Sequence, residues 1–311
     1  MTTTRLPGTD LDLFPLVLGG NVFGWSADEP TSYAVLDAFV AAGGTMVDSA
    51  DAYARWLGNG GGESETILGR WMASRGNRDD VIVATKMGKL PPYENLRPGS
   101  IVAACDDSLR RLQTDRVDLY YAHQDHEGDD LAPALEAFDS LVRAGKVRYV
   151  AASNFTTARL GEALDLQEQN GWAPFVALQP EYSLMARTEY ETEYTAFCTE
   201  RGLGTLPYFS LARGFLTGKY RAGERIDSVR YEGAAMFVGE RGDRVLEALV
   251  AVAAAHSTTG AAVALAWLRA RPAVVAPIAS ARTPDQLADL LPTAGIELTA
   301  DEVALLETAS D

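Results

Sequence analysis

The sequence predicts an α/β protein in which a single domain, residues 1–311, folds as a (β/α)8 TIM barrel. Short apolar runs alternate with longer amphipathic stretches eight times, and no linker rich in proline, glycine or serine divides the chain. The run Val81–Ala84 is apolar throughout and Val147–Ala151 is apolar apart from Arg148, which is typical of parallel strands covered on both faces. Eight such units in a chain of this length favour a closed barrel over an open, doubly wound sheet.

The eight expected strands are short apolar or β-branched runs at Leu16–Gly20, Thr45–Ser49, Asp80–Lys86, Leu119–His123, Val147–Ser153, Phe175–Gln179, Leu203–Pro207 and Ala273–Ile278. The expected helices lie between and after them, at Thr31–Ala42, Glu63–Ser74, Gly99–Leu112, Leu131–Ala144, Thr156–Gln169, Glu189–Arg201, 241–256, 260–270, Asp285–Leu291 and from Thr299 onward. The pattern therefore includes extra C-terminal helices. Arg5–Leu16, with the turn sequence Pro7-Gly8-Thr9, predicts an N-terminal β-hairpin ahead of the first barrel strand.

The charge balance argues against nucleic acid and membrane surfaces as partners. Lys and Arg number 27 against 43 Asp and Glu, which gives a formal net charge of −16, and no run of basic residues opposes that field. No apolar stretch approaches the roughly 18 residues that a membrane-spanning helix needs, and no apolar core of a signal peptide follows Met1. The two cysteines, Cys105 and Cys198, form no CxxC pair, which predicts free buried thiols and a cytoplasmic location.

Polar residues gather at the carboxyl ends of the expected strands, where a barrel places its active site. Asp48 and Tyr53 lie at the end of the second strand, Lys86 ends the third and His123 ends the fourth. Because Lys86 ends a buried strand, it needs a carboxylate partner, and Asp48 on the neighbouring strand is the nearest candidate. Each residue alone could be a helix cap, a packing tyrosine or a core histidine, but four at one face predict a catalytic site.

Three segments resemble the aldo-keto reductase superfamily, in particular its bacterial, NADP-dependent members related to potassium-channel β subunits. The first is Gly44–Tyr53 (GTMVDSADAY), together with Lys86 and His123. The second is Arg143–Val150 (RAGKVRYV) followed by Ser153-Asn154-Phe155, and the third is Tyr208–Tyr220 (YFSLARGFLTGKY). The resemblance extends from the N-terminal hairpin to the last helix.

The resemblance implies an enzyme that reduces a carbonyl group by hydride transfer from NADPH. Tyr53 would deliver the proton, and Asp48 would orient Lys86. An unperturbed tyrosine has a pKa of about 10, so the nearby Lys86 ammonium is expected to favour the phenolate. His123, neutral or sharing a proton in the network, would hydrogen-bond the carbonyl oxygen.

The resemblance also implies a cofactor that lies extended over the barrel mouth, because no G-x-G-x-x-G fingerprint follows a strand. The implied cofactor-binding residues are Gly20, Asn21, Val22, Asp48, Ser153, Asn154, Gln179, Tyr208, Ser210, Leu211, Ala212, Arg213, Gly214, Lys219, Ser280, Arg282, Gln286 and Asp289. Arg282 matches a position whose guanidinium meets the 2′-phosphate, which favours NADPH over NADH. Two residues depart from the family pattern: Ser280 replaces a frequent glycine, and Leu290 replaces an asparagine that faces the adenine. The glycine-rich segment Gly58–Gly62 is interpreted as a flexible rim of the active site, because it runs into acidic residues that would repel phosphate.

The expected substrate is a small carbonyl compound, an aldehyde, a ketone or a keto-sugar. Its pocket is expected to be lined by Phe23, Trp25, Trp56, Tyr93 and His126, with Val22, Tyr53 and residues 230–238. No metal is expected, since the sequence has only three histidines and no H-x-H pair on the first strand, which disfavours a metal-dependent hydrolase. The alternative function is an NADP-binding regulatory or sensor module with little turnover, like the channel β subunits. The pattern makes no prediction about the oligomeric state.

Overall fold

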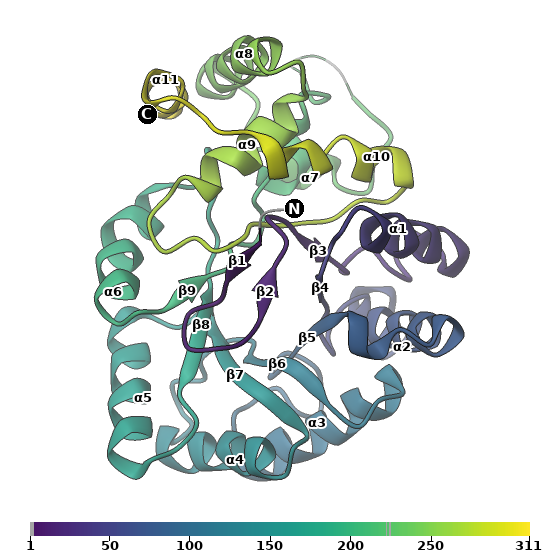
Figure 1. Ribbon diagram of the computed structural model, residues 1–311, viewed down its shortest axis with the longest axis vertical. Helices are drawn as coiled ribbons and strands as arrows, with labels where there is room; N and C mark the ends of the chain where they lie inside the picture. Colours follow the sequence, from purple (N-terminus) through teal and green to yellow (C-terminus); the bar gives the residue numbers. More distant parts are fainter. Residues whose placement is uncertain (1–2, 222, 224) are drawn as a thin grey trace.

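The computed structural model describes residues 3–221, 223 and 225–311, and it confirms the predicted barrel (Figure 1). The eight barrel strands are β3 (Val17–Gly19), β4 (Met46–Asp48), β5 (Ile82–Met87), β6 (Val117–Ala122), β7 (Val147–Ser153), β8 (Phe175–Gln179), β9 (Gly204–Thr205) and β10 (Ile278–Ala279). All neighbouring pairs are parallel, in the order β10-β3-β4-β5-β6-β7-β8-β9. A parallel bridge between Thr205 and Val274 brings the two ends of the sheet together and closes the barrel.

The hairpin closes the amino-terminal end of the barrel. It consists of β1 (Thr4–Arg5) and β2 (Asp12–Leu13), an antiparallel pair that crosses this end in Figure 1. Its buried side chains Leu6, Leu11 and Leu13 belong to the same apolar cluster as the inward-facing strand residues, including Val17 and Leu119. Because apolar side chains fill this end, chemistry is left to the carboxyl ends of the strands.

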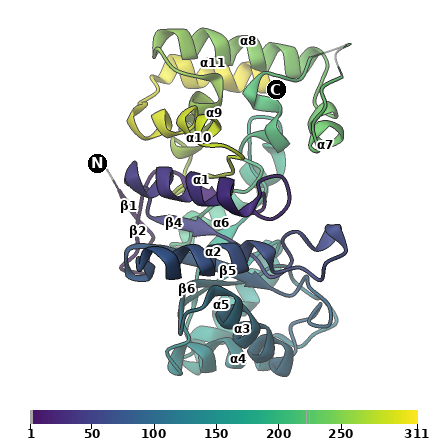
Figure 2. The ribbon, with the colours of Figure 1, turned by 90° about the vertical axis from the view of Figure 1, so that its right-hand side faces the viewer.

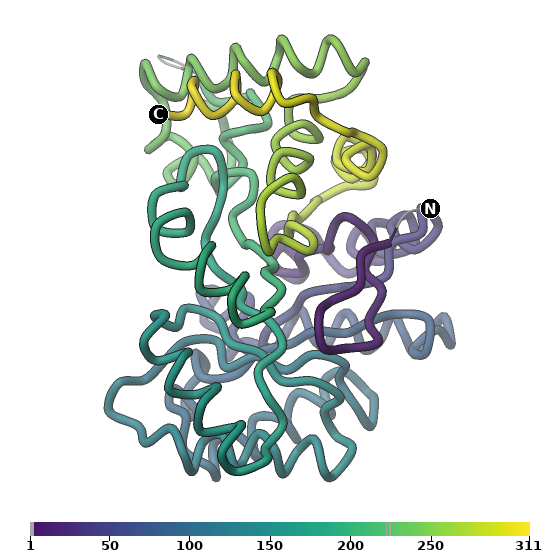
Figure 3. The backbone as a smooth tube through the Cα atoms, turned by 60° about the vertical axis from the view of Figure 1, so that its left-hand side comes forward, coloured from purple at the N-terminus to yellow at the C-terminus, as the bar shows by residue number. Residues whose placement is uncertain are grey.

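Helices surround the sheet, and their bounds are α1 (Glu29–Ala41), α2 (Glu63–Arg75), α3 (Pro98–Leu112), α4 (Leu131–Arg143), α5 (Thr157–Asn170), α6 (Thr195–Glu200), α7 (Tyr231–Ala235), α8 (Glu240–Ala255), α9 (Gly260–Arg269), α10 (Pro284–Ala288) and α11 (Ala300–Ser310). The extra C-terminal helices α8 and α11 lie together at one end of the molecule, as Figure 2 shows. Figure 3 shows the same two helices running side by side. No single described helix has the length and apolar composition to cross a membrane, and α8 and α9 pass that test only as a pair bent by 92°.

The strand and helix order is the predicted one, but some elements differ. The stretch Glu189–Arg201 is a π-helical turn (Tyr190–Tyr194) followed by α6, and the tyrosines at the two ends of the turn donate to the carbonyl oxygens of Pro272 and Phe155. The last expected strand, Ala273–Ile278, makes one bridge at Val274 before regular pairing starts at Ile278. Short α7 lies between the expected strand Leu203–Pro207 and the expected helix 241–256, where the sequence predicted no element.

Candidate active site

The parallel register brings the predicted catalytic residues to one end of the barrel. Asp48 is the last residue of β4 and pairs with Gly19 of β3 and Ala84 of β5. Lys86 lies two residues further along β5, and His123 follows the end of β6 directly. Since the carboxyl ends of parallel strands meet at the same rim, residues from separate strands face one cavity.

Lys86 is fully buried and all three of its ammonium protons have acceptors. Its Nζ atom lies 2.6 Å from Asp48 Oδ2, 2.7 Å from the Ser49 carbonyl oxygen and 2.9 Å from the Tyr53 hydroxyl. The Tyr53 hydroxyl in turn donates to Asp48 Oδ2 at 3.2 Å. A buried ammonium is tolerated only when it is paired and hydrogen-bonded, so these contacts fix the position of Tyr53.

Asp48 is held from the far side of the barrel as well. Gln179, the last residue of β8, donates its Nε2 hydrogen to Asp48 Oδ1 at 3.0 Å. Both Asp48 oxygens therefore accept charged or neutral hydrogen bonds while the side chain stays buried. The carboxylate consequently has one orientation, which it imposes on Lys86 and Tyr53.

The net effect on Tyr53 differs from the expected lowering by Lys86. Burial and the Asp48 carboxylate raise the pKa of the Tyr53 phenol well above 10.0. Burial also lowers the pKa of Lys86, although Asp48 acts in the opposite direction. Desolvation disfavours both ionised forms, and here it outweighs the attraction of the ammonium for a phenolate. Tyr53 therefore keeps its proton at neutral pH.

His123 stands beside Tyr53 and is neutral. The two rings meet edge to face with their centroids 6.2 Å apart. Burial, followed by the positive charges of Lys86 and Lys89, lowers the pKa of His123 well below 6.5. A neutral imidazole can donate one hydrogen bond to an oxygen atom without adding charge to the pocket.

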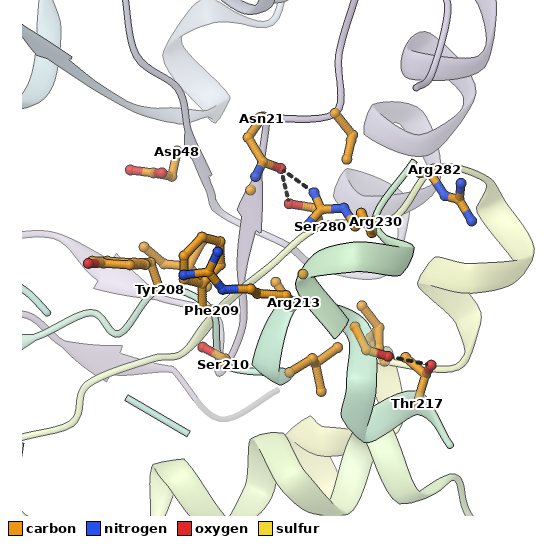
Figure 4. Close-up of a pocket in the computed structure, with 18 of the residues that line it drawn as sticks. Asn21, Asp48, Tyr208, Phe209, Ser210, Arg213, Thr217, Arg230, Ser280 and Arg282 are labelled. Atoms are coloured by element: carbon orange, nitrogen blue, oxygen red, sulfur yellow. Dashed lines mark hydrogen bonds between the residues drawn. The ribbon is translucent and has the colours of Figure 1, made fainter. Parts of the chain in front are cut away.

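These residues open into a cavity of about 930 Å³ at the carboxyl ends of the strands. The predicted site residues that line it are Asn21, Val22, Trp25, Asp48, Tyr53, Trp56, His123, Ser153, Asn154, Gln179, Tyr208, Ser210, Leu211, Arg213, Gly214, Lys219, Ser280, Arg282, Gln286 and Asp289. Figure 4 shows Asp48 and Tyr208 at one side of this cavity and Arg282 at the other. One continuous space thus connects the catalytic residues with the most distant predicted cofactor contacts.

The other predicted residues lie outside the lining of this cavity. Lys86 and Gly20 lie behind it, and Ala212 is buried. Phe23 is fully buried in the core, so its ring packs inside the protein. Tyr93 packs partly against the same core, and His126 hydrogen-bonds the Gly88 carbonyl oxygen at 2.8 Å.

A network of polar side chains connects the strand ends near Tyr208. Asn154 Nδ2 donates to the His123 carbonyl oxygen at 2.8 Å, and its Oδ1 accepts the Tyr208 hydroxyl proton at 2.8 Å. Asn154 has a positive φ of 56°, a conformation that asparagine tolerates better than most residues. Ser153 donates to the Gln179 carbonyl oxygen at 2.8 Å. The amide and hydroxyl groups are therefore fixed at the cavity wall before any ligand binds.

The segment after Tyr208 has an unusual backbone. Phe209, Ala212, Arg213 and Gly214 all have positive φ values, from 46° to 98°. Non-glycine residues in this region are strained, and such strain clusters at ligand-binding sites. The turn directs the Arg213 guanidinium over the Phe209 ring, 4.3 Å from its centroid, as seen in Figure 4.

Sequence comparison identifies the family to which this barrel belongs. Residues 15–311 match the aldo/keto reductase family. The chain belongs to that family.

The similarity to individual relatives covers almost the whole length of this aldo/keto reductase. It is 31% identical to Protein tas of Escherichia coli, with 97% of this chain and 96% of that protein covered. It is 32% identical to the oxidoreductase YrpG of Bacillus subtilis, with 98% and 95% covered. It is 30% identical to norsolorinic acid reductase B of Aspergillus parasiticus, with 97% and 82% covered. The family, together with the oxidoreductase and reductase names of the last two relatives, supports the assignment of this chain as an oxidoreductase.

Sequence reasoning missed several residues that line this cavity, among them Lys89, and did not single out Arg230 within residues 230–238. Lys89 follows β5 by two residues, and this position beyond a strand end was the signal that could have indicated it. The exposed apolar residue Val229 also lines the cavity and was not predicted. No group of three or more His, Cys, Asp or Glu within the described ranges could hold a metal ion.

The neutral state of His123 predicts a pH-dependent stability. Because the folded protein holds the pKa of His123 below 6.5, the unfolded chain takes up this proton first as the pH falls. The free energy of unfolding then decreases below pH 6.5, and a His123→Asn variant should lose about 2 kcal/mol less than the wild type between pH 7 and pH 5. Urea unfolding at both pH values measures this difference. Equal losses in the two proteins would show that folding does not lower the pKa of His123.

Proposed function

We propose that this protein reduces an aldehyde or ketone to an alcohol with NADPH, and that Tyr53 donates the proton. The observation that carries the proposal is the position of the Tyr53 hydroxyl, which lines the cavity beside His123 while contacting Lys86 Nζ at 2.9 Å and Asp48 Oδ2 at 3.2 Å. A hydroxyl fixed in this way can turn its proton from Asp48 toward a carbonyl oxygen in the cavity. This geometry suits general acid catalysis.

The residues around the cavity fit a dinucleotide that carries phosphate groups. Arg213, Lys219 and Arg282 line it, and none of the three forms an ion pair with any carboxylate in the described part of the chain. In a chain with a net charge of −16, such unpaired cations indicate an anionic ligand. We propose that Arg213 and Lys219 hold the pyrophosphate, Arg282 the 2′-phosphate, and Ser153, Asn154 and Gln179 the carboxamide. The bound NADPH would supply the hydride.

The raised pKa of Tyr53 suits the reductive direction. Burial and Asp48 keep the phenol protonated, so the proton is available at the moment when the carbonyl oxygen gains negative charge. An alkoxide is a much stronger base than a phenolate, so proton transfer to it is favourable. Lys86 would then stabilise the phenolate that remains, since its Nζ already touches that oxygen. His123 would hold the carbonyl oxygen with a neutral hydrogen bond.

Replacing Tyr53 with phenylalanine tests the proton donor. The change removes one oxygen and leaves the ring between Lys86 and His123. Because general acid catalysis contributes about 10²–10⁴-fold, kcat should fall by at least that order while the dissociation constant for NADPH stays within a few-fold. NADPH oxidation with a panel of aldehydes measures the first quantity, and fluorescence titration measures the second.

Near-normal turnover by the Tyr53→Phe variant would mean that the proton comes from another group. Tight NADPH binding by the wild type without turnover of any aldehyde or ketone would instead support a sensor module.

Arg282 provides a test of cofactor choice. It lines both the main cavity and a smaller adjoining one, and its guanidinium has no hydrogen-bond acceptor within the described ranges. A charge-assisted bond to a phosphate contributes about 1.5–3 kcal/mol, so NADPH should bind about tenfold or more tightly than NADH. The Arg282→Ala variant should lose this preference. Equal dissociation constants for the two cofactors in the wild type would contradict the assignment.

A further inference from the structure

A buried carboxyl group that the proposed mechanism does not use lies directly behind Lys86. Asp51 follows β4 by three residues, and its backbone amide donates to the Lys86 carbonyl oxygen at 3.1 Å. Asp51 is only 1% exposed, and neither of its carboxylate oxygens has a hydrogen-bond partner among the described residues. Because an ionised carboxylate without partners is very costly to bury, this geometry favours the protonated acid.

A neighbouring glutamate takes the arginine that could have paired with Asp51. Glu65 of α2 is fully buried, and its Oε2 atom accepts a hydrogen bond from Arg111 Nε at 2.6 Å. The other oxygen of Glu65 accepts the Thr85 hydroxyl proton, and Arg111 Nη2 donates to the Ser108 hydroxyl at 3.3 Å. Glu65 therefore has an ion-pair partner, whereas Asp51 has none within the described part of the chain.

The charges around Asp51 reinforce the effect of its burial. Burial, followed by the charge of Glu65, raises the pKa of Asp51 to about 8. Arg111, Lys86 and the nearby Ala52 amide oppose this rise only in part. Asp51 therefore carries a proton at pH 7. Figure 1 shows α2 and α3 outside β5 and β6, and the titratable and charged groups of this cluster come from these four elements: Glu65 of α2, Cys105 and Arg111 of α3, Lys86 of β5 and Tyr120 of β6.

The charge of Asp51 acts on the catalytic lysine. Burial lowers the pKa of Lys86, and the directly bonded Asp48 raises it most strongly. A negative charge on Asp51 raises the pKa of Lys86 as well, although the Asp51 carboxyl group does not touch the ammonium. The protons of Asp51 and Lys86 are therefore coupled. When Asp51 loses its proton, Lys86 holds its own proton more firmly.

We propose that Asp51 is a positioning residue for carbonyl reduction, which holds a proton at neutral pH and, by releasing it at alkaline pH, becomes a second counter-ion that keeps Lys86 charged. This inference rests on the proposed reduction and adds to it a residue that acts through Lys86. A charged Lys86 stabilises the phenolate that Tyr53 leaves after proton transfer, because Lys86 Nζ contacts that oxygen. Asp51 therefore extends carbonyl reduction to a higher pH than Asp48 alone allows.

The titration of Lys86 tests this coupling without any substrate. The sequence has four lysines, Lys86, Lys89, Lys146 and Lys219, so carbon-13 NMR of lysine-labelled protein gives few signals, and the Lys86→Met variant assigns one of them. In an Asp51→Asn variant, Lys86 should lose its proton at a pH about one unit lower than in the wild type. The physical reason is that the amide has nearly the shape of the carboxyl group but cannot become charged.

An Asp165→Asn variant is the matched control. It makes the same chemical change on α5, where Asp165 forms an exposed ion pair with Arg201 at 2.8 Å. In this variant Lys86 should titrate as in the wild type. Equal titration of Lys86 in the wild type and in Asp51→Asn would overturn the proposal, as would an equal shift in the control.

Urea unfolding tests the proton on Asp51 itself. Above about pH 3.8 the unfolded chain loses this proton, whereas the folded protein retains it up to about pH 8. Raising the pH through this window therefore destabilises the wild type but not Asp51→Asn. The ratio of the unfolding constant of the wild type to that of the variant should rise about tenfold for each pH unit between pH 5 and pH 7. A constant ratio, or an Asp51→Asn variant that does not fold at pH 7, would overturn the proposal.

The pH dependence of kcat, measured with saturating NADPH and an aldehyde, connects Asp51 to the reaction. The alkaline limb of the profile should lie about one pH unit lower in Asp51→Asn than in the wild type. The position of this limb is the readout, because a purely structural defect lowers kcat at every pH without moving the limb. A shifted Lys86 titration in a protein that reduces no aldehyde would refute the proposed reaction and support the coupling of Asp51 to Lys86. Turnover with the alkaline limb at the same pH in both proteins would overturn the role of Asp51 and leave the reaction standing.

Discussion

The buried ammonium of Lys86 is the constraint on which the site depends. Its three donors are matched by acceptors on Asp48, Ser49 and Tyr53 at 2.6, 2.7 and 2.9 Å. An unpaired buried ion costs several kcal/mol, so this geometry cannot relax without loss of stability. The β4–β5 pairing holds Asp48 and Lys86 on neighbouring strands. Gln179 of β8 donates a hydrogen bond to the other oxygen of Asp48 from across the barrel. The fold therefore determines the position of the Tyr53 hydroxyl.

Burial has opposite chemical consequences for the two residues that face the cavity beside Lys86. It raises the pKa of Tyr53, which retains its proton, and lowers the pKa of His123, which stays neutral. One residue can therefore donate a proton, and the other can donate a hydrogen bond without adding charge. The cations further along the cavity, including Arg213 and Arg282, have no carboxylate partners within the described ranges and suit phosphate groups.

The barrel could be predicted from sequence because its strands are buried on both faces and its helices are amphipathic, and both patterns are local. The meeting of Asp48, Lys86 and His123 could be predicted as well, since parallel strands place their ends together. The direction of the Tyr53 pKa could not, because it depends on how far burial outweighs a nearby ammonium. The presence of Lys89 in the cavity lining also escaped prediction, because it depends on the path of the loop after β5. Long-range packing similarly turns Phe23 into the core.

The central claim is that Lys86 enables Tyr53 to transfer its proton. Single-turnover NADPH oxidation by a Lys86→Met variant measures this role most directly. The variant leaves Asp48 buried beside Tyr53 without its ion-pair partner. NADPH titration and thermal unfolding of the variant are therefore needed to check that its barrel is intact. The single-turnover rate should fall by at least about 100-fold while NADPH affinity stays within a few-fold. A rate within a few-fold of the wild type in a folded, NADPH-binding variant would contradict the account.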